Sequence, residues 1–66
     1  MILKCKIKDI RYNVRMTQAA LSDLTGITVG QISCIENGKT YPTAYTLWKI
    51  SNALRCKVDD LYTVIY

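Results

Sequence analysis

Five positions in the middle of the chain carry residues that could contact the edges of nucleic-acid bases. They are Val29, Gly30, Gln31, Ser33 and Cys34. A hydroxyl or an amide can exchange hydrogen bonds with a base edge, and a valine can contact a thymine methyl group. Because the set is poor in hydrogen-bonding groups, we expect modest base discrimination, or discrimination that depends on DNA shape. The alternative is that these are simply small surface residues.

These positions belong to a segment, Thr17–Gly38, that has the pattern of two short helices around a turn. Apolar residues recur near helical spacing in both halves, at Ala19, Leu21 and Leu24 and then at Ile32 and Ile35. Gly26 stands where the first helix would end, because glycine enters the left-handed conformation without a Cβ clash. Thr28 offers a hydroxyl that can cap the next helix. The segment therefore predicts a helix-turn-helix, whose second helix can lie in a DNA major groove.

Short motifs continue in order on both sides of this segment. They are Met16–Leu21, Gly26–Thr28, Ile32, Ile35–Lys39, Pro42–Thr43, Leu47, Ile50, Ala53–Leu54 and Val58–Leu61. The series closely resembles the phage repressor and Cro-type (Xre) DNA-binding family, from about Ile7 to Leu61. The resemblance implies an all-α, compact bundle of about five short helices with a helix-turn-helix, the lambda-repressor-like DNA-binding domain. We expect a single domain, 1–66, with helices near 7–13, 17–24, 28–36, 43–54 and 58–61, of which 28–36 is the recognition helix.

Both ends of the chain have the pattern of β-strands. Residues 1–8 alternate apolar side chains with lysines, and residues 62–66 are rich in β-forming side chains. We therefore expect strands at 1–6 and 62–66 that form a small two-stranded antiparallel sheet, as an addition to the family pattern. Since an isolated pair of strands is marginal in water, this sheet should pack against something, such as a second subunit.

The resemblance also implies roles for polar residues around the recognition helix. The positions that match phosphate-contacting residues are Gln18, Thr28, Asn37, Lys39 and Thr40, with Arg15 and Tyr41 as weaker candidates. Arg11 and Glu36 match a structural salt bridge that links the third helix to the first. Arg15 and Arg55 stand where the family often has glycine, and we expect backbone strain at Arg15.

Composition argues against several other classes of protein. The net charge of +4 comes entirely from residues 1–15; a basic segment suits a polyanionic partner, although charge alone does not identify one. Cys5, Cys34 and Cys56 are widely spaced and the chain has no histidine, so we expect no metal site, no cofactor and no disulfide framework. No nucleophile–base pair stands at a recognisable spacing, so we expect no enzyme.

Segment lengths point to a small protein of the cytoplasm. No apolar run approaches the ~20 residues of a membrane helix, and the N-terminal segment is too short and too basic for a signal peptide. We therefore expect a cytoplasmic location and no membrane contact. For a chain of 66 residues we also expect no separate domain that senses a small-molecule ligand.

Together these features predict a sequence-specific transcriptional regulator that binds double-stranded DNA. We expect a homodimer on a palindromic operator, because two copies double the few base contacts of one small domain. A protein-interaction module with the same fold is the alternative, since the five expected base-contacting residues offer few hydrogen-bonding groups. A further hypothesis is that oxidation of Cys34 switches DNA binding off. We expect Trp48 to be a core or subunit-contact residue rather than a platform on which bases stack.

Overall fold

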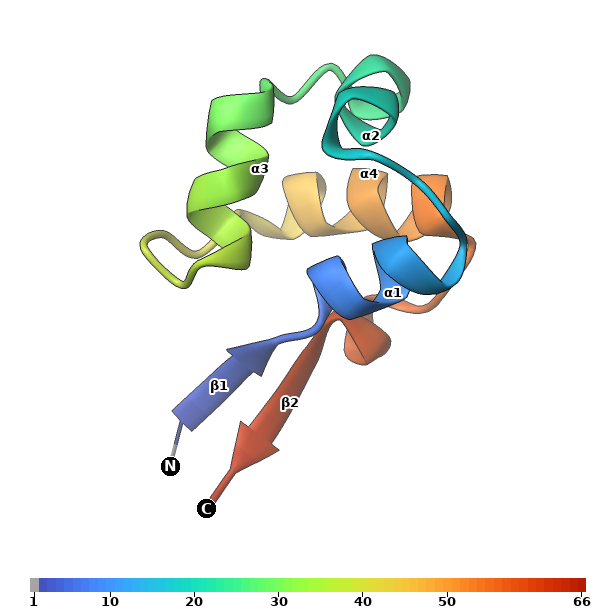
Figure 1. Ribbon diagram of the computed structural model, residues 1–66. Helices are drawn as coiled ribbons and strands as arrows, with labels where there is room; N and C mark the ends of the chain where they lie inside the picture. The colour runs from blue at the N-terminus through green and yellow to red at the C-terminus, as the bar shows by residue number, and fades with distance from the viewer. Residues whose placement is uncertain (1) are drawn as a thin grey trace.

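The computed structural model describes residues 2–66 and contains four α-helices, one 3-10 helix and two strands (Figure 1). In chain order they are β1 (Ile2–Cys5), α1 (Ile7–Asn13), α2 (Gln18–Thr25), α3 (Val29–Glu36), α4 (Ala44–Leu54), the 3-10 helix η1 (Val58–Leu61) and β2 (Tyr62–Ile65). The expected helix-turn-helix bundle is confirmed, except that its fifth helix is a 3-10 turn. Both strands are shorter than the expected 1–6 and 62–66, and Met1 lies outside the described residues.

Threonine caps set the starts of α2, α3 and α4. Thr17, Thr28 and Thr43 have extended backbones, and each hydroxyl oxygen accepts a hydrogen bond from the backbone N–H three residues later. Because an N-cap lies just outside its helix, these helices begin one residue later than the expected 17, 28 and 43.

Three helices end in one hydrogen-bond pattern around a residue with left-handed backbone. These residues are Arg15 after α1, Gly38 after α3 and Arg55 after α4, with φ values of 56°, 74° and 56°. In each case the N–H groups of this residue and the next donate to carbonyls three and five residues earlier, which is a Schellman motif. Since a Cβ destabilises the left-handed region by about 1–2 kcal/mol, both arginines carry backbone strain, as expected for Arg15.

A single apolar core joins the helices and η1. Its buried side chains are Ile7, Leu21, Ile27, Ile32, Ile35, Ile50, Leu54 and Leu61. Two of these belong to α3, so that helix is anchored to the rest of the domain along one side. Ile27 lies in the turn before α3 and is 5% exposed, so the turn itself is fixed by the core.

Three residues expected in apolar stripes lie outside this core. Leu24 is 64% exposed, and Ala19 is exposed as well. The inward face of α2 is occupied by Leu21 and Thr25, whose buried hydroxyl donates to the Leu21 carbonyl oxygen at 2.7 Å. Val14 is exposed because it follows the last residue of α1, where helical spacing no longer applies.

The outer face of α4 is not covered by the rest of the described chain. Trp48 is 54% exposed, and its ring stacks on that of Tyr45 with ring centroids 6.1 Å apart. The prediction that Trp48 could lie in the core is therefore wrong, and a subunit contact stays a prediction. Ala44, the first residue of α4, is exposed too, and the buried residues of this helix are Ile50, Ser51 and Leu54.

β1 and β2 form the expected antiparallel sheet, which projects from the helical body (Figure 1). Its register pairs Ile2 with Ile65 and Cys5 with Tyr62. The inner end of the sheet packs against the core through Cys5 and Tyr62. At the outer end Ile2 is 66% exposed and Ile65 45%, so nothing in residues 2–66 fully covers this apolar tip.

Candidate nucleic-acid interface

The outer face of α3 is accessible from solvent. It carries all five expected base-contacting residues: Val29, Gly30 and Gln31 are exposed, and Ser33 and Cys34 are half-buried. A Cβ on Gly30 would meet only the Thr28 hydroxyl, at 4.0 Å. Packing within the described chain therefore does not require glycine at this position.

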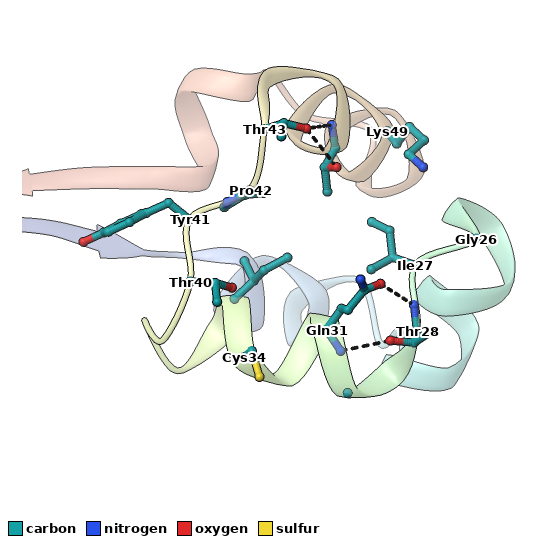
Figure 2. A pocket seen from close by; sticks show the side chains of 13 residues that line it. Gly26, Ile27, Thr28, Gln31, Cys34, Thr40, Tyr41, Pro42, Thr43 and Lys49 are labelled. Carbon is teal, nitrogen blue, oxygen red and sulfur yellow. Dashed lines mark hydrogen bonds between the residues drawn. The ribbon is translucent and has the colours of Figure 1, made fainter.

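Two grooves border α3, one on each side. The α1-side groove measures about 550 Å³ and lies between α1, the start of α2, and α3; Lys8, Tyr12, Gln18, Val29, Ser33 and Asn37 are among its lining residues. The α4-side groove measures about 790 Å³ and lies between α3, the loop that precedes α4, and α4; Gly30, Gln31, Cys34, Thr40, Tyr41 and Lys49 are among its lining residues (Figure 2). The helix α3 is thus a ridge, and the expected base-contacting residues are divided between its two flanks.

Gln31 takes part in the cap of its own helix. Its backbone N–H donates to the Thr28 hydroxyl at 3.1 Å, while its side-chain oxygen accepts from the Thr28 N–H at 3.2 Å (Figure 2). This reciprocal pair is a capping box, and the spacing of a threonine and a glutamine three residues apart could have predicted it. Only the Nε2 donors of Gln31 remain for a partner.

Arg11 and Glu36 form a buried, two-pronged ion pair beneath the α1-side groove. Arg11 Nε donates to Glu36 Oε2 at 2.8 Å and Nη2 donates to Oε1 at 3.1 Å. The two side chains are only 5% and 3% exposed, and Arg11 Nη1 also donates to the Met16 carbonyl at 2.9 Å. The hydrogen bonds that the guanidinium donates to the Glu36 carboxylate raise the pKa of Arg11. The pair therefore links α1 to the end of α3 and leaves neither charge free.

Gln18, the first residue of α2, is held by the same carboxylate. Its Nε2 donates to Glu36 Oε1 at 2.9 Å. The side-chain oxygen of Gln18, Oε1, and the second Nε2 hydrogen have no hydrogen-bond partner among the described residues. Sequence reasoning gave Gln18 a phosphate contact only, because the partner lies 18 residues away in the chain and no local pattern signals it.

Four of the other expected phosphate contacts line the two grooves beside α3. Asn37 lines the α1-side groove and its Nδ2 donates to the Ser33 hydroxyl at 3.3 Å. Thr28, Thr40 and Tyr41 line the α4-side groove. Tyr41 also packs on β2, with its ring centroid 6.2 Å from that of Tyr62.

Two other expected phosphate contacts lie outside the grooves. Lys39 and Arg15 are exposed and line neither of the two grooves. Both lie in the turn that closes a helix, Arg15 after α1 and Lys39 after α3. Neither charge is therefore part of a groove wall.

Sequence reasoning missed two residues of α1 that line the α1-side groove, Lys8 and Tyr12. The Lys8 ammonium lies 5.7 Å from the centroid of the Tyr12 ring. Their spacing of four residues on one helix was a usable signal, because such residues lie on the same face. In the sequence, Lys8 stands out only as one of the basic residues of the N-terminal segment, residues 1–15.

The three cysteines are free and half-buried. Burial raises the pKa of the Cys5 and Cys56 thiols, which makes the reactive thiolate scarcer at neutral pH. These two residues therefore behave as small apolar groups. Cys34 lines the α4-side groove, and its role as a redox switch stays a hypothesis.

A capped helix that follows a left-handed glycine turn, with one side in a core and the other uncovered, defines a helix-turn-helix domain. Gly26 at φ 76° and the Thr28 cap supply the turn and the start of the second helix. The profile of the helix-turn-helix family matches residues 7–61. The chain belongs to this family, and its resemblance to the phage repressor and Cro-type (Xre) regulators is confirmed. Both terminal strands lie outside the matched range.

Curated relatives are named as transcriptional regulators. The chain is 33% identical over 61 residues to the cryptic phage CTXphi transcriptional repressor RstR of Vibrio cholerae, a match that covers 92% of this chain and 54% of that repressor. It is 28% identical over 60 residues to the uncharacterized HTH-type transcriptional regulator YgzD of Bacillus subtilis, with 91% of each chain covered. An uncharacterized HTH-type regulator of Archaeoglobus fulgidus is also 28% identical, over 91% of this chain and 84% of its own length.

A solved structure supports the same fold. The P22 c2 repressor, crystallised with a synthetic operator, superposes with a TM-score of 0.77 at 33% identity, and the match covers 82% of each chain. The family to which these proteins belong is one of DNA-binding regulators, not of enzymes. Among the described residues, no helix is long and apolar enough to cross a membrane.

Proposed function

We propose that this protein is a sequence-specific transcriptional regulator that binds double-stranded DNA with α3 in the major groove, as a homodimer on a palindromic operator. Family membership already gives the broader class, a DNA-binding transcriptional regulator. The observation that carries the finer proposal is the uncovered outer face of α3 between its two grooves. A cytoplasmic location, expected from the sequence, belongs to the same proposal.

Base contacts would come from short side chains and from close approach of the helix. Ser33 offers a hydroxyl and Val29 a methyl-rich surface to the α1-side groove, while Gln31 keeps amide donors on the other flank. Gly30 supports the proposal because no packing inside the chain explains it, whereas a duplex close to the helix backbone would. Cys34 adds only a weak thiol donor. We therefore expect DNA shape to contribute to the choice of sequence.

Phosphate contacts would surround the ridge on both sides. Gln18 is oriented by Glu36 at the start of α2, and its free amide groups can meet a phosphate beside the α1-side groove. The unpaired N–H groups at the start of α3, next to Thr28, favour an anion. The loop after α3 would hold the opposite strand through Asn37, Lys39, Thr40 and Tyr41, and Arg15 adds a nearby cation.

The homodimer rests on the apolar surface that the isolated chain leaves uncovered. The outer half of the terminal sheet exposes Ile2, Leu3, Val64 and Ile65. A two-stranded sheet of this kind is marginal in water unless it packs on something else. A second copy would cover it and would set two recognition helices on half-sites about one helical turn apart.

Selection of bound duplexes from a random pool, followed by anisotropy measurements on the selected sequence, tests the function. We expect an inverted repeat and an affinity that falls steeply with salt, because each phosphate contact releases counterions. A selected sequence without symmetry would overturn the palindromic operator. A failure to enrich any duplex at low salt would overturn DNA binding by this chain.

A protein-interaction module remains the second candidate, and the outer face of α4 favours it. Tyr45 and Trp48 are 66% and 54% exposed and stacked, and the Lys49 ammonium lies 4.9 Å from the Tyr45 ring centroid. Exposed aromatic pairs are common at protein interfaces. The Trp48→Ala variant separates the two candidates, because a DNA regulator that dimerises through its terminal sheet should keep its operator affinity while a module should lose its protein partner.

A further inference from the structure

We propose that α1 adds a DNA phosphate contact of its own, through the Lys8 ammonium at the rim of the α1-side groove. This inference rests on the proposed function and names a binding residue that neither the family match nor the sequence motifs single out. Three observations support it: the charge balance of the groove, the surroundings of each N-terminal lysine, and the contact between Lys8 and Tyr12.

Lys8 is the uncompensated charge of this groove. The other charged residues that line it are Arg11 and Glu36, which neutralise each other in the buried ion pair. The remaining polar groups on its walls are the neutral amides of Gln18 and Asn37 and the hydroxyls of Tyr12, Thr17 and Ser33. A phosphate that approached the groove would therefore meet a single cation with hydrogen-bond donors around it, a combination that suits the sugar–phosphate backbone.

The structure distinguishes three lysines that the sequence presents as equivalent. Lys4 belongs to β1, where it pairs with Thr63 on the projecting sheet. Lys6 is engaged by Asp9, with its Nζ 3.2 Å from a carboxylate oxygen. Lys8 alone of the three lines a groove beside α3. Its charge is the one that can act at the proposed interface.

Tyr12 positions the Lys8 ammonium. The ring, one turn along α1, has Lys8 Nζ 5.7 Å from its centroid and the Arg11 guanidinium carbon at 4.9 Å. A cation over an aromatic face is attracted to it, and the contact restricts an otherwise mobile side chain. Tyr12 itself is 60% exposed, so the pair stays accessible to a partner.

The test measures operator affinity as a function of salt for the full chain and its variants. We use the duplex selected above and compare Lys8→Gln with Lys4→Gln, which removes the same charge from the sheet. Each lost phosphate contact should reduce the slope of log affinity against log salt by about 0.9. The variant homodimer loses one contact in each subunit, so its slope should fall by about 1.8, equivalent to about sixtyfold weaker binding at 0.1 M salt. We expect this change for Lys8→Gln, an unchanged slope for Lys4→Gln, and recovery in Lys8→Arg.

A second measurement locates the contact on the DNA. Single phosphates of the operator are replaced in turn by uncharged methylphosphonates. One replacement should weaken the wild-type protein and leave Lys8→Gln unaffected, because a contact that is already absent cannot be lost again. Equal slopes for the wild type and Lys8→Gln, or equal losses in the Lys4 and Lys8 variants, would overturn the inference. A wild-type protein without salt-dependent DNA binding would instead overturn the proposed function.

Discussion

Gln18 Nε2 lies 2.9 Å from Glu36 Oε1, so the first residue of α2 is held by the last residue of α3. The same carboxylate receives two hydrogen bonds from Arg11 of α1. One buried acid therefore ties three helices together directly beneath the proposed DNA surface. Because a buried charge is costly without its partner, this link should control both stability and the orientation of Gln18.

Replacing Glu36 by leucine should strongly destabilise the domain. The variant leaves the Arg11 guanidinium buried and unpaired, so the free energy of unfolding should fall by about 3–5 kcal/mol in urea unfolding followed by circular dichroism. The matched control carries leucine at both Arg11 and Glu36, and it should lose much less. A single variant that loses under about 1 kcal/mol would show that the pair behaves like a surface salt bridge.

Replacing Arg55 by glycine should stabilise the domain. Glycine removes left-handed strain of about 1–2 kcal/mol. Its greater conformational freedom in the unfolded chain lowers the free energy of unfolding by roughly 0.5–1 kcal/mol. The net gain of about 0.5–1 kcal/mol should raise Tm by several degrees in a thermal melt. Arg55→Ala keeps the Cβ and serves as the control. If alanine stabilises as much as glycine, strain at this residue is not the cause.

Stability should fall at high pH through Tyr62. Its hydroxyl is buried, and this burial raises the pKa of Tyr62 from 10.0 to about 12. The unfolded chain loses the Tyr62 proton at a lower pH than the folded chain does. The contribution of this residue to the free energy of unfolding is therefore fully present below pH 10 and is lost as the pH rises from 10 to 12. Urea unfolding across this range should show a smaller decline for Tyr62→Phe than for the wild type. Equal declines would exclude Tyr62 as a source.

Polar substitutions at the tip of the sheet should weaken the proposed dimer. Ile65→Lys places a charge on the exposed apolar end of β2, opposite Ile2. Sedimentation should show a shift from dimer to monomer and operator affinity should fall, while helix content stays unchanged. Tyr45→Lys, on the outer face of α4, is the comparison. An unaltered sedimentation profile for the Ile65 variant would place the dimer contact elsewhere.

The helix-turn-helix could be predicted because its signals are local. The Gly26 turn, the threonine caps and the isoleucine spacing of 32 and 35 each depend on residues within one or two turns of helix. The core assignment was less complete. Leu24 has the spacing of a buried residue and Trp48 is a large aromatic, yet both are exposed. Periodicity and residue type indicate an apolar face but do not say whether another element covers it.

The sequence alone determined the family, the order of the elements and the residues on the outer face of α3, because short-range backbone preferences and motif spacing suffice for these. Only the tertiary structure brought Gln18 to Glu36 and distinguished Lys8 from its neighbouring lysines. Those relationships join residues that are distant in the chain, or depend on which side chain faces a groove. Packing of all the helices decides them together. The spacing of Lys8 and Tyr12 places both on one face of α1, but only the packing shows that this face borders α3.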